Sequence, residues 1–96
     1  MFQQIREKLK SDGFVNFNYS PKDLFTFSHF DRLVQVQLFE EENTATISSY
    51  GMNSTEESEI VFKLTMFVPN VKTVSAIVDL ATSEAQAHTA LKQQES

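Results

Sequence analysis

The order of apolar and polar residues along the chain predicts a helix, then several strands, then a second helix. Phe2, Ile5 and Leu9 recur at i, i+3 and i+7, which is the period of one helix face. Gly13 follows as a stop signal, so we expect a helix over about residues 2–11. From Val15 the period changes to two, which is typical of a strand with one buried face.

Period-two alternation continues, with interruptions, as far as Val68. The predicted strands cover residues 15–19, 24–28, 33–39, 44–48 and 59–68. The connections between most of them are short, so an antiparallel meander of four or five strands is expected. Residues 51–58 are rich in Gly, Asn, Ser, Thr and Glu, and they predict an exposed loop.

A second helix is expected after the last strand. Pro69 ends that strand because proline cannot donate to the ladder, and Asn70 is a good N-cap for a helix. The apolar stripe of this helix consists of Val74, Ile77, Val78 and Ala81. Ser83 and Gln86 have capping-box spacing, so residues 83–96 either continue the helix or form a separate, frayed helical tail.

These elements predict a single α+β domain over residues 1–96, with both helices on one face of an antiparallel sheet. A chain of 96 residues is long enough for one core and too short for two. The in-phase positions of the strands and of the second helix predict a shared core. It consists of Phe17, Val36, Phe62, Leu64, Ile77 and Val78.

Composition narrows the classes of function. The chain has no cysteine, which excludes a disulfide framework, a thiolate metal site and a cysteine nucleophile. Its formal net charge of −5 opposes binding to a phosphate backbone, so no direct nucleic-acid partner is expected. It has no run of 18 apolar residues and no signal-peptide pattern at the N-terminus, and a cytoplasmic protein without a membrane partner is expected.

The residues that could carry chemistry form no recognisable catalytic, cofactor or metal site. His29 and His88 are far apart in sequence and have no partner at metal-ligand spacing. No serine lies in a Gly-x-Ser-x-Gly elbow, and two glycines are too few for a phosphate-binding loop. We therefore expect a protein that is not an enzyme and holds no cofactor or metal.

Two acidic clusters are the most visible charge feature, and they leave two interpretations open. Glu40, Glu41 and Glu42 form one cluster, and residues 56–59 contribute Glu56, Glu57 and Glu59 to the other. Because one strand separates them, a meander places them at opposite ends of the sheet. They are either solvated turns or, in the case of Glu40, Glu41 and Glu42, a secondary candidate interface that mimics phosphate charge.

The sheet face opposite the helices is the main candidate interface. Two helices cover only one face of such a sheet, so the other face is either solvated or docked on a partner. It carries neutral polar residues with two aromatic rings among them, a composition that suits an interface core. The candidate interface residues are Gln35, Gln37, Phe39, Thr44, Thr46 and Phe67.

The opening helix with Ile5-Arg6-Glu7-Lys8-Leu9, the strand after it, the hairpin of residues 33–49 and the acidic balance together resemble small phage-encoded inhibitors of the anti-CRISPR kind. The resemblance covers roughly residues 2–50 and lies in the architecture, not in a diagnostic motif. It implies an inhibitor that blocks a bacterial defence enzyme by occupying a surface, without catalysis.

The chain is also similar to type III secretion chaperones, which are small, acidic and α+β, with an opening helix before an antiparallel sheet. That similarity implies a dimer that holds a partner segment in extended form. The chain departs from the pattern because no pair of strands follows the helix after Pro69. The expected function is therefore a non-catalytic protein-binding module, either an inhibitor or a chaperone-like protein, present as a monomer or a homodimer.

Overall fold

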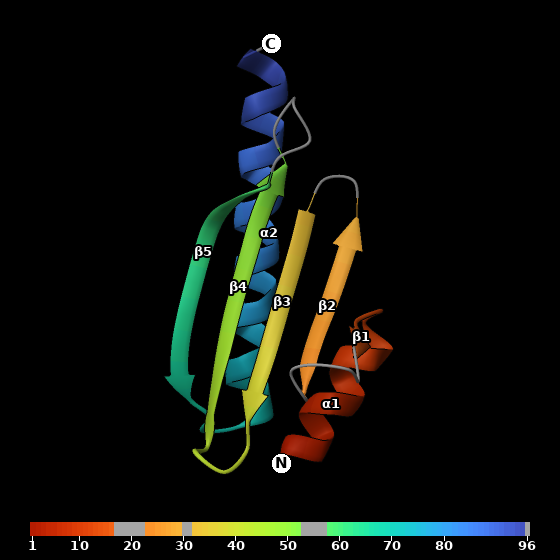
Figure 1. Cartoon of the computed structure of the whole chain (residues 1–96), viewed down its shortest axis with the longest axis vertical. Helices are drawn as coiled ribbons and strands as arrows, with labels where there is room; N and C mark the ends of the chain where they lie inside the picture. Colours follow the sequence, from red (N-terminus) through yellow and green to blue (C-terminus); the bar gives the residue numbers. More distant parts are fainter. Residues whose placement is uncertain (17–22, 30–31, 53–57, 96) are drawn as a thin grey trace.

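The computed structural model describes residues 1–16, 23–29, 32–52 and 58–95 (Figure 1). It has an N-terminal helix, a five-stranded antiparallel sheet and a C-terminal helix, so the predicted α+β class is confirmed. The elements are α1 (Phe2–Ser11), β1 (Val15–Asn16), β2 (Leu24–His29), β3 (Arg32–Phe39), β4 (Thr44–Met52), β5 (Ser58–Phe67) and α2 (Val71–Glu95).

Helix α1 ends where the sequence predicts, and the backbone shows why. Gly13 has a φ of 97°, a left-handed conformation that glycine adopts without a steric penalty. Its N–H donates to the carbonyl of Lys10, and the N–H of Phe14 donates to the carbonyl of Leu9. This pair of bonds is a Schellman motif, and Phe14 and Leu9 are both buried in the core beside it.

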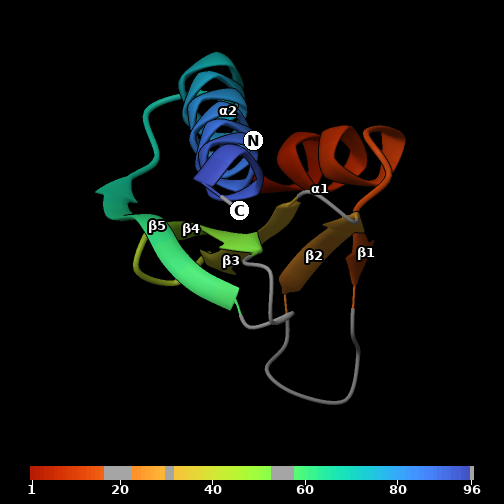
Figure 2. The same ribbon diagram turned by 90° about the horizontal axis from the view of Figure 1, so that it is seen from above.

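The strands lie in the order β1-β2-β3-β4-β5, and every neighbouring pair is antiparallel. Both helices lie on the same side of this sheet (Figure 2). We call the side under the helices the inner face and the opposite side the outer face. Because side chains alternate between the faces, Val34, Val36 and Leu38 point to the inner face, and Gln35, Gln37 and Phe39 point to the outer face.

The core lies between the inner face and the helices. Both helices, β2, β3 and β4 contribute buried apolar side chains, and Val68, directly after β5, adds one more. Of the predicted core residues, Val36 and Val78 are buried, and Phe62 and Ile77 are partly buried against the core. Phe17 lies outside the described residues.

The prediction that Leu64 is buried is wrong, although its strand phase is right. Leu64 pairs with the fully buried Ile47, so it is on the inner face, yet 37% of its surface is exposed. The reason is position: β5 is an edge strand, and α2 contacts β4 more extensively than β5. Burial at an edge depends on how far the covering helix reaches, which the alternation of residues does not encode.

A β-bulge in β5 also changes which residues of that strand face the core. Ser49 pairs with Phe62, but the next residue of β4, Tyr50, pairs with Ile60, so Val61 is an extra residue. The bulge reverses the phase of the residues before it. Ile60 therefore lies opposite an outer-face residue and is 60% exposed, although regular alternation with Phe62 and Leu64 would place it on the inner face.

Helix α2 begins at the predicted cap, because the side-chain oxygen of Asn70 accepts a hydrogen bond from the N–H of Thr73 at 2.8 Å. The helix then continues without interruption through residues 83–95. Strand β4 is longer than predicted. Its last two residues, Gly51 and Met52, belong to the ladder with β5, whereas their composition had indicated a loop.

Candidate functional site

The structure brings the six candidate interface residues together on the outer face. Phe39, Thr44 and Phe67 form one row, because Thr44 pairs with Phe39 on one side and with Phe67 on the other. The two rings are thus separated by a single threonine. Phe67 is 76% exposed and Phe39 is partly buried.

The next rows continue this surface with neutral polar groups. Thr46 pairs with Gln37 on β3 and with Thr65 on β5, and the hydroxyls of Thr46 and Thr65 are 2.9 Å apart, within hydrogen-bond distance. One row further, Gln35 accepts a weak hydrogen bond from the hydroxyl of Tyr50 at 3.5 Å. These two contacts join polar side chains of neighbouring strands across the face.

The outer face is also nearly free of charge over these rows. The third row consists of Gln35, Ser48 and Lys63, and Lys63 is the one charged side chain among the described residues of the three rows. No described helix or strand covers them, since α1 and α2 both lie on the inner face (Figure 2). This part of the outer face is therefore nearly neutral and has two aromatic rings at one end.

In the acidic turn between β3 and β4, Glu40 takes part in an ion-pair network, whereas Glu41 and Glu42 are exposed. Arg6 of α1 makes a two-point ion pair with Asp23, at 3.0 and 2.9 Å, and reaches Glu40 at 3.1 Å. Hydrogen bonds to Asp23, and secondarily to Glu40, raise the pKa of Arg6 above its usual value. The ion pairs bind α1 to the start of β2 and to the β3–β4 turn.

No local pattern in the sequence predicts this network, because Asp23 and Glu40 lie 17 and 34 residues from Arg6. One local feature belongs to it: Asp23 has a φ of 58°, a conformation that Asp tolerates better than most residues. Its carbonyl also accepts a hydrogen bond from the N–H of Leu38. Glu41 and Glu42, in contrast, are exposed at the end of the hairpin.

The second acidic cluster contributes one described residue, Glu59, at the start of β5. Glu59 and the β3–β4 turn lie at opposite ends of the sheet, as predicted (Figure 1); Glu56 and Glu57 lie outside the described residues. The Oε2 atom of Glu59 is 3.0 Å from Nε2 of His88. His88 therefore faces the sheet from α2.

Gly51 explains how His88 approaches the sheet so closely. A Cβ atom at Gly51 would clash with the imidazole ring of His88, so the ring occupies the space that a side chain on β4 would fill. The sequence contained a signal for this contact, since a glycine inside a strand often marks a close approach. An open depression of about 380 Å³ adjoins the pair and is lined by Ile60, Val61, Glu84, Ala87 and His88.

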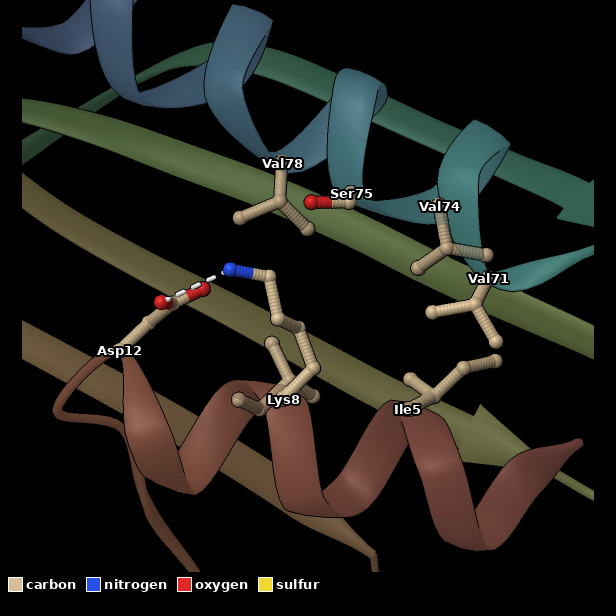
Figure 3. Close-up of a pocket in the computed structure, with 8 residues that line it drawn as sticks. Ile5, Lys8, Asp12, Val71, Val74, Ser75 and Val78 are labelled. Atoms are coloured by element: carbon tan, nitrogen blue, oxygen red, sulfur yellow. Dashed lines mark hydrogen bonds and ion pairs between the residues drawn. The ribbon is translucent and has the colours of Figure 1, made fainter.

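A cavity lies between the two helices, with Lys8 of α1 and Asp12, the C-cap of α1, facing Ser75 and Val78 of α2 across it (Figure 3). Its volume is about 10 Å³, enough for about one water molecule and too small for an organic ligand. Lys8 pairs with Asp12 at 3.1 Å at its mouth. We interpret the cavity as a packing defect between α1 and α2.

A cluster of metal ligands and a membrane-spanning helix are both absent from the described part of the chain. No group of three or more His, Asp or Glu side chains there is arranged to hold a metal ion. No helix there is long and apolar enough to cross a membrane. No protein-family model, no curated protein and no solved structure matches the chain.

Proposed function

We propose that the chain is a small, non-catalytic module that binds a protein partner through the outer face of its sheet. The observation that carries the proposal is the grouping of Phe39 and Phe67 in one row with neutral Gln and Thr side chains behind them. This grouping lies on a face that no described element covers.

The chemistry of this face favours a protein as the partner. Interface cores are depleted of charged residues and enriched in aromatic ones, because neutral groups lose their water at a lower cost than charges. Phe67 exposes most of its ring and is held on a regular strand, so little conformational entropy is lost when a partner covers it. A nucleic acid would require basic residues, and Lys63 is the one that these rows provide.

The exposed carboxylates of the β3–β4 turn would act at the rim of this interface. Glu41 and Glu42 lie next to the row of Phe39 and Thr44, at the end of the same hairpin. Rim charges mainly change the rate of association and its salt dependence, whereas central contacts mainly change the rate of dissociation. The two groups of residues are therefore separable by kinetics.

The resemblance of residues 2–50 to anti-CRISPR-type inhibitors supports a more specific form of the proposal. In this form the partner is an enzyme of a bacterial defence system, and the chain inhibits it by occupying a surface. The inference of an inhibitor rests on the architecture and not on a motif. The enzyme that is inhibited must therefore be identified by experiment.

The test begins with capture of the partner from a lysate of the source cell and its identification by mass spectrometry. Binding of the purified partner is then measured by surface plasmon resonance. Phe39→Ala, Phe67→Ala and Gln37→Lys should raise the dissociation rate at least about tenfold, which corresponds to the loss of about 1.4 kcal/mol of binding free energy. Gln86→Lys makes the same change of charge on an exposed position of α2 and should leave the kinetics unchanged.

A different result would favour the acidic turn as the interface. Glu41→Lys should lower the association rate and its salt dependence while the dissociation rate stays within about a factor of two. If Glu41→Lys abolishes binding while Phe39→Ala and Gln37→Lys leave it unchanged, the outer face is not the interface. The turn of Glu40, Glu41 and Glu42 would then become the better account, as a mimic of phosphate charge.

A further inference from the structure

Strand β5 forms an open edge of the sheet. It spans ten residues and has β4 as its one neighbour among the described strands. Large apolar side chains gather along it, with Ile60, Leu64 and Phe67 exposed by 60%, 37% and 76%. Natural edge strands are usually short, charged, bulged or interrupted by proline, because an open edge can pair with another strand. The bulge at Val61 protects the start of β5. From its bulge to Phe67, β5 carries one charge, Lys63, and no proline.

The backbone of β5 offers its unpaired groups at every second residue. Val68 donates its N–H to the carbonyl of Asn43, in line with the β4–β5 ladder. In an antiparallel ladder the direction of these groups alternates, so Met66 and Leu64 also direct theirs toward β4. Lys63, Thr65 and Phe67 therefore direct their N–H and C=O groups toward the open edge.

We infer that this edge pairs with the β5 edge of a second copy of the chain, antiparallel and about a two-fold axis at Leu64. The proposal is independent of the partner proposed for the outer face. The regular part of β5 runs from the bulge at Val61 to Phe67, and Leu64 is its midpoint. Pairing about Leu64 therefore uses the whole regular segment of both copies.

The side chains of β5 are self-complementary in this register. On the inner face, Leu64 meets Leu64 of the second copy, and Phe62 meets Met66 of the second copy, so apolar groups pair with apolar groups. On the outer face, Lys63 meets Thr65 of the second copy. A shift of the axis by one residue, to Lys63, would place two lysines directly opposite each other, which is unfavourable.

The charge of the chain is compatible with this arrangement although each copy carries a net charge of −5. Glu59 and Lys63 are the charged residues of β5, and neither meets a like charge of the second copy in this register. Glu59 falls opposite Pro69 of the second copy, beyond the regular segment. Within β5, pairing with a second copy therefore brings no two carboxylates together.

Helix α2 supplies a further apolar residue at the level of the axis. The contact of His88 with Glu59 fixes the height of the helix above β5, and the two elements run in opposite directions. Because Val61 is an extra residue, Leu64 lies four ladder positions from Glu59, which is about 13 Å at about 3.3 Å each and corresponds to about nine residues of helix at 1.5 Å each. Leu64 is therefore level with Asp79, and the exposed Leu80 is the next residue of the helix.

Leu80 also lies on the side of α2 that faces β5, since Glu84, one turn later, lines the same depression as Ile60 and Val61. In the paired assembly, Leu80 of both copies would flank the two Leu64 side chains. Dimerisation at this edge would therefore cover the exposed apolar side chains of both β5 and α2.

Sedimentation equilibrium tests the inference on the whole chain. From about 5 μM to about 500 μM, the mass should rise from the 11.0 kDa of one chain toward twice that value, because association follows mass action. Leu64→Lys should weaken association at least tenfold by placing two charges at the axis. Thr65→Pro should do the same by removing an edge N–H that the β4 ladder does not use. Val15→Lys, an exposed apolar residue on the opposite edge of the sheet, is the matched control and should dimerise as the original chain does.

The absence of native cysteine provides a direct reading of the register. Leu64→Cys should form a disulfide-linked dimer on mild oxidation, since directly opposed residues bring their Cα atoms within about 4.4–6.8 Å. Thr65→Cys is the matched control, offset from its own copy by two residues, and should cross-link at least tenfold more slowly. Circular dichroism of each variant confirms that it is folded.

Three results would overturn the inference. The first is a chain that remains at 11.0 kDa over the whole concentration range. The second is a dimer that both Leu64→Lys and Thr65→Pro leave intact. The third is a dimer in which Thr65→Cys cross-links and Leu64→Cys does not, because the axis would then lie elsewhere.

Discussion

Replacement of Gly51 by alanine tests the closest contact between α2 and the sheet. A Cβ at this position would clash with Cδ2 of His88 and would lie 2.9 Å from its Cγ and 3.2 Å from its Cβ. The ring could rotate away, but the Cβ of His88 is fixed to a helix whose neighbouring residues Ala81 and Ala85 are fully buried on the sheet. We therefore expect Gly51→Ala to shift α2 or to displace the ring, and to destabilise the fold.

Two opposing effects determine how much Gly51→Ala changes the free energy of unfolding. Overpacking of a closely packed site costs about 1–3 kcal/mol of unfolding free energy. Replacing glycine by alanine also restricts the unfolded chain, which stabilises the folded state by about 0.4–1 kcal/mol where the backbone permits it. Since the clash involves ring atoms and a backbone-attached carbon, overpacking should dominate. The net loss should be about 1–2 kcal/mol, a large fraction of the stability of a small domain.

A double-mutant cycle with His88→Ala isolates the contact, with urea denaturation as the assay. Without the ring, Gly51→Ala should be neutral or stabilising by up to about 1 kcal/mol, so the coupling energy should be about 1–3 kcal/mol. The cycle cancels the lost hydrogen bond between His88 and Glu59, because both variants that carry His88→Ala lack it. Equal destabilisation by Gly51→Ala in the two backgrounds would refute the reasoning, as would a loss below about 0.5 kcal/mol in the original chain.

Three further predictions concern stability, and denaturant melts measure each. Phe25→Ala should cost about 3–5 kcal/mol of unfolding free energy because the ring is fully buried. Leu64→Ala should cost under about 1 kcal/mol because Leu64 lies on the edge strand and is partly exposed. Similar losses for the two variants would contradict the placement of Leu64 at the edge. Asn70→Ala should cost about 0.5–2 kcal/mol through the lost cap of α2, and an unchanged melt would show that the cap is dispensable. Arg6→Met should cost about 1–2 kcal/mol because it breaks a two-point ion pair, while Lys8→Met in the exposed pair should cost under about 0.5 kcal/mol. Equal losses for Arg6→Met and Lys8→Met would show that the ion pairs of Arg6 with Asp23 and Glu40 do not stabilise the fold.

Local sequence signals predicted the elements whose boundaries depend on local chemistry. Gly13 and Asn70 end and begin helices through backbone and cap bonds to residues within one turn, so the composition near them was sufficient. The hairpin of β3 and β4 was readable for the same reason, since its alternation is regular and its turn is polar. The outer-face rows follow directly from that alternation, and the candidate interface was predictable to the same extent.

The features that were missed depend on contacts between distant residues. The bulge at Val61 leaves no mark in the alternation of β5, yet it turns Ile60 outward and Glu59 inward, toward His88. The composition around Gly51 predicts a loop because glycine is common in loops, whereas its actual role depends on His88, 37 residues later in the chain. Likewise, Arg6 resembled any other helix-surface cation until the fold placed Asp23 beside it.

The two proposed surfaces meet at Phe67, and this makes them separable. Phe67 lies on the outer face in the row of Phe39, and it is also the last residue of the open edge. Its exposure alone therefore assigns it to neither surface. Phe39 belongs to the face only, because β4 lies between it and the edge, and Leu64 belongs to the edge only, because it points to the inner face. If both proposals hold, Phe39→Ala weakens partner binding and leaves the dimer intact, Leu64→Lys has the opposite effects, and Phe67→Ala weakens both. An effect of Phe67→Ala on one process and not on the other would assign this ring to one surface.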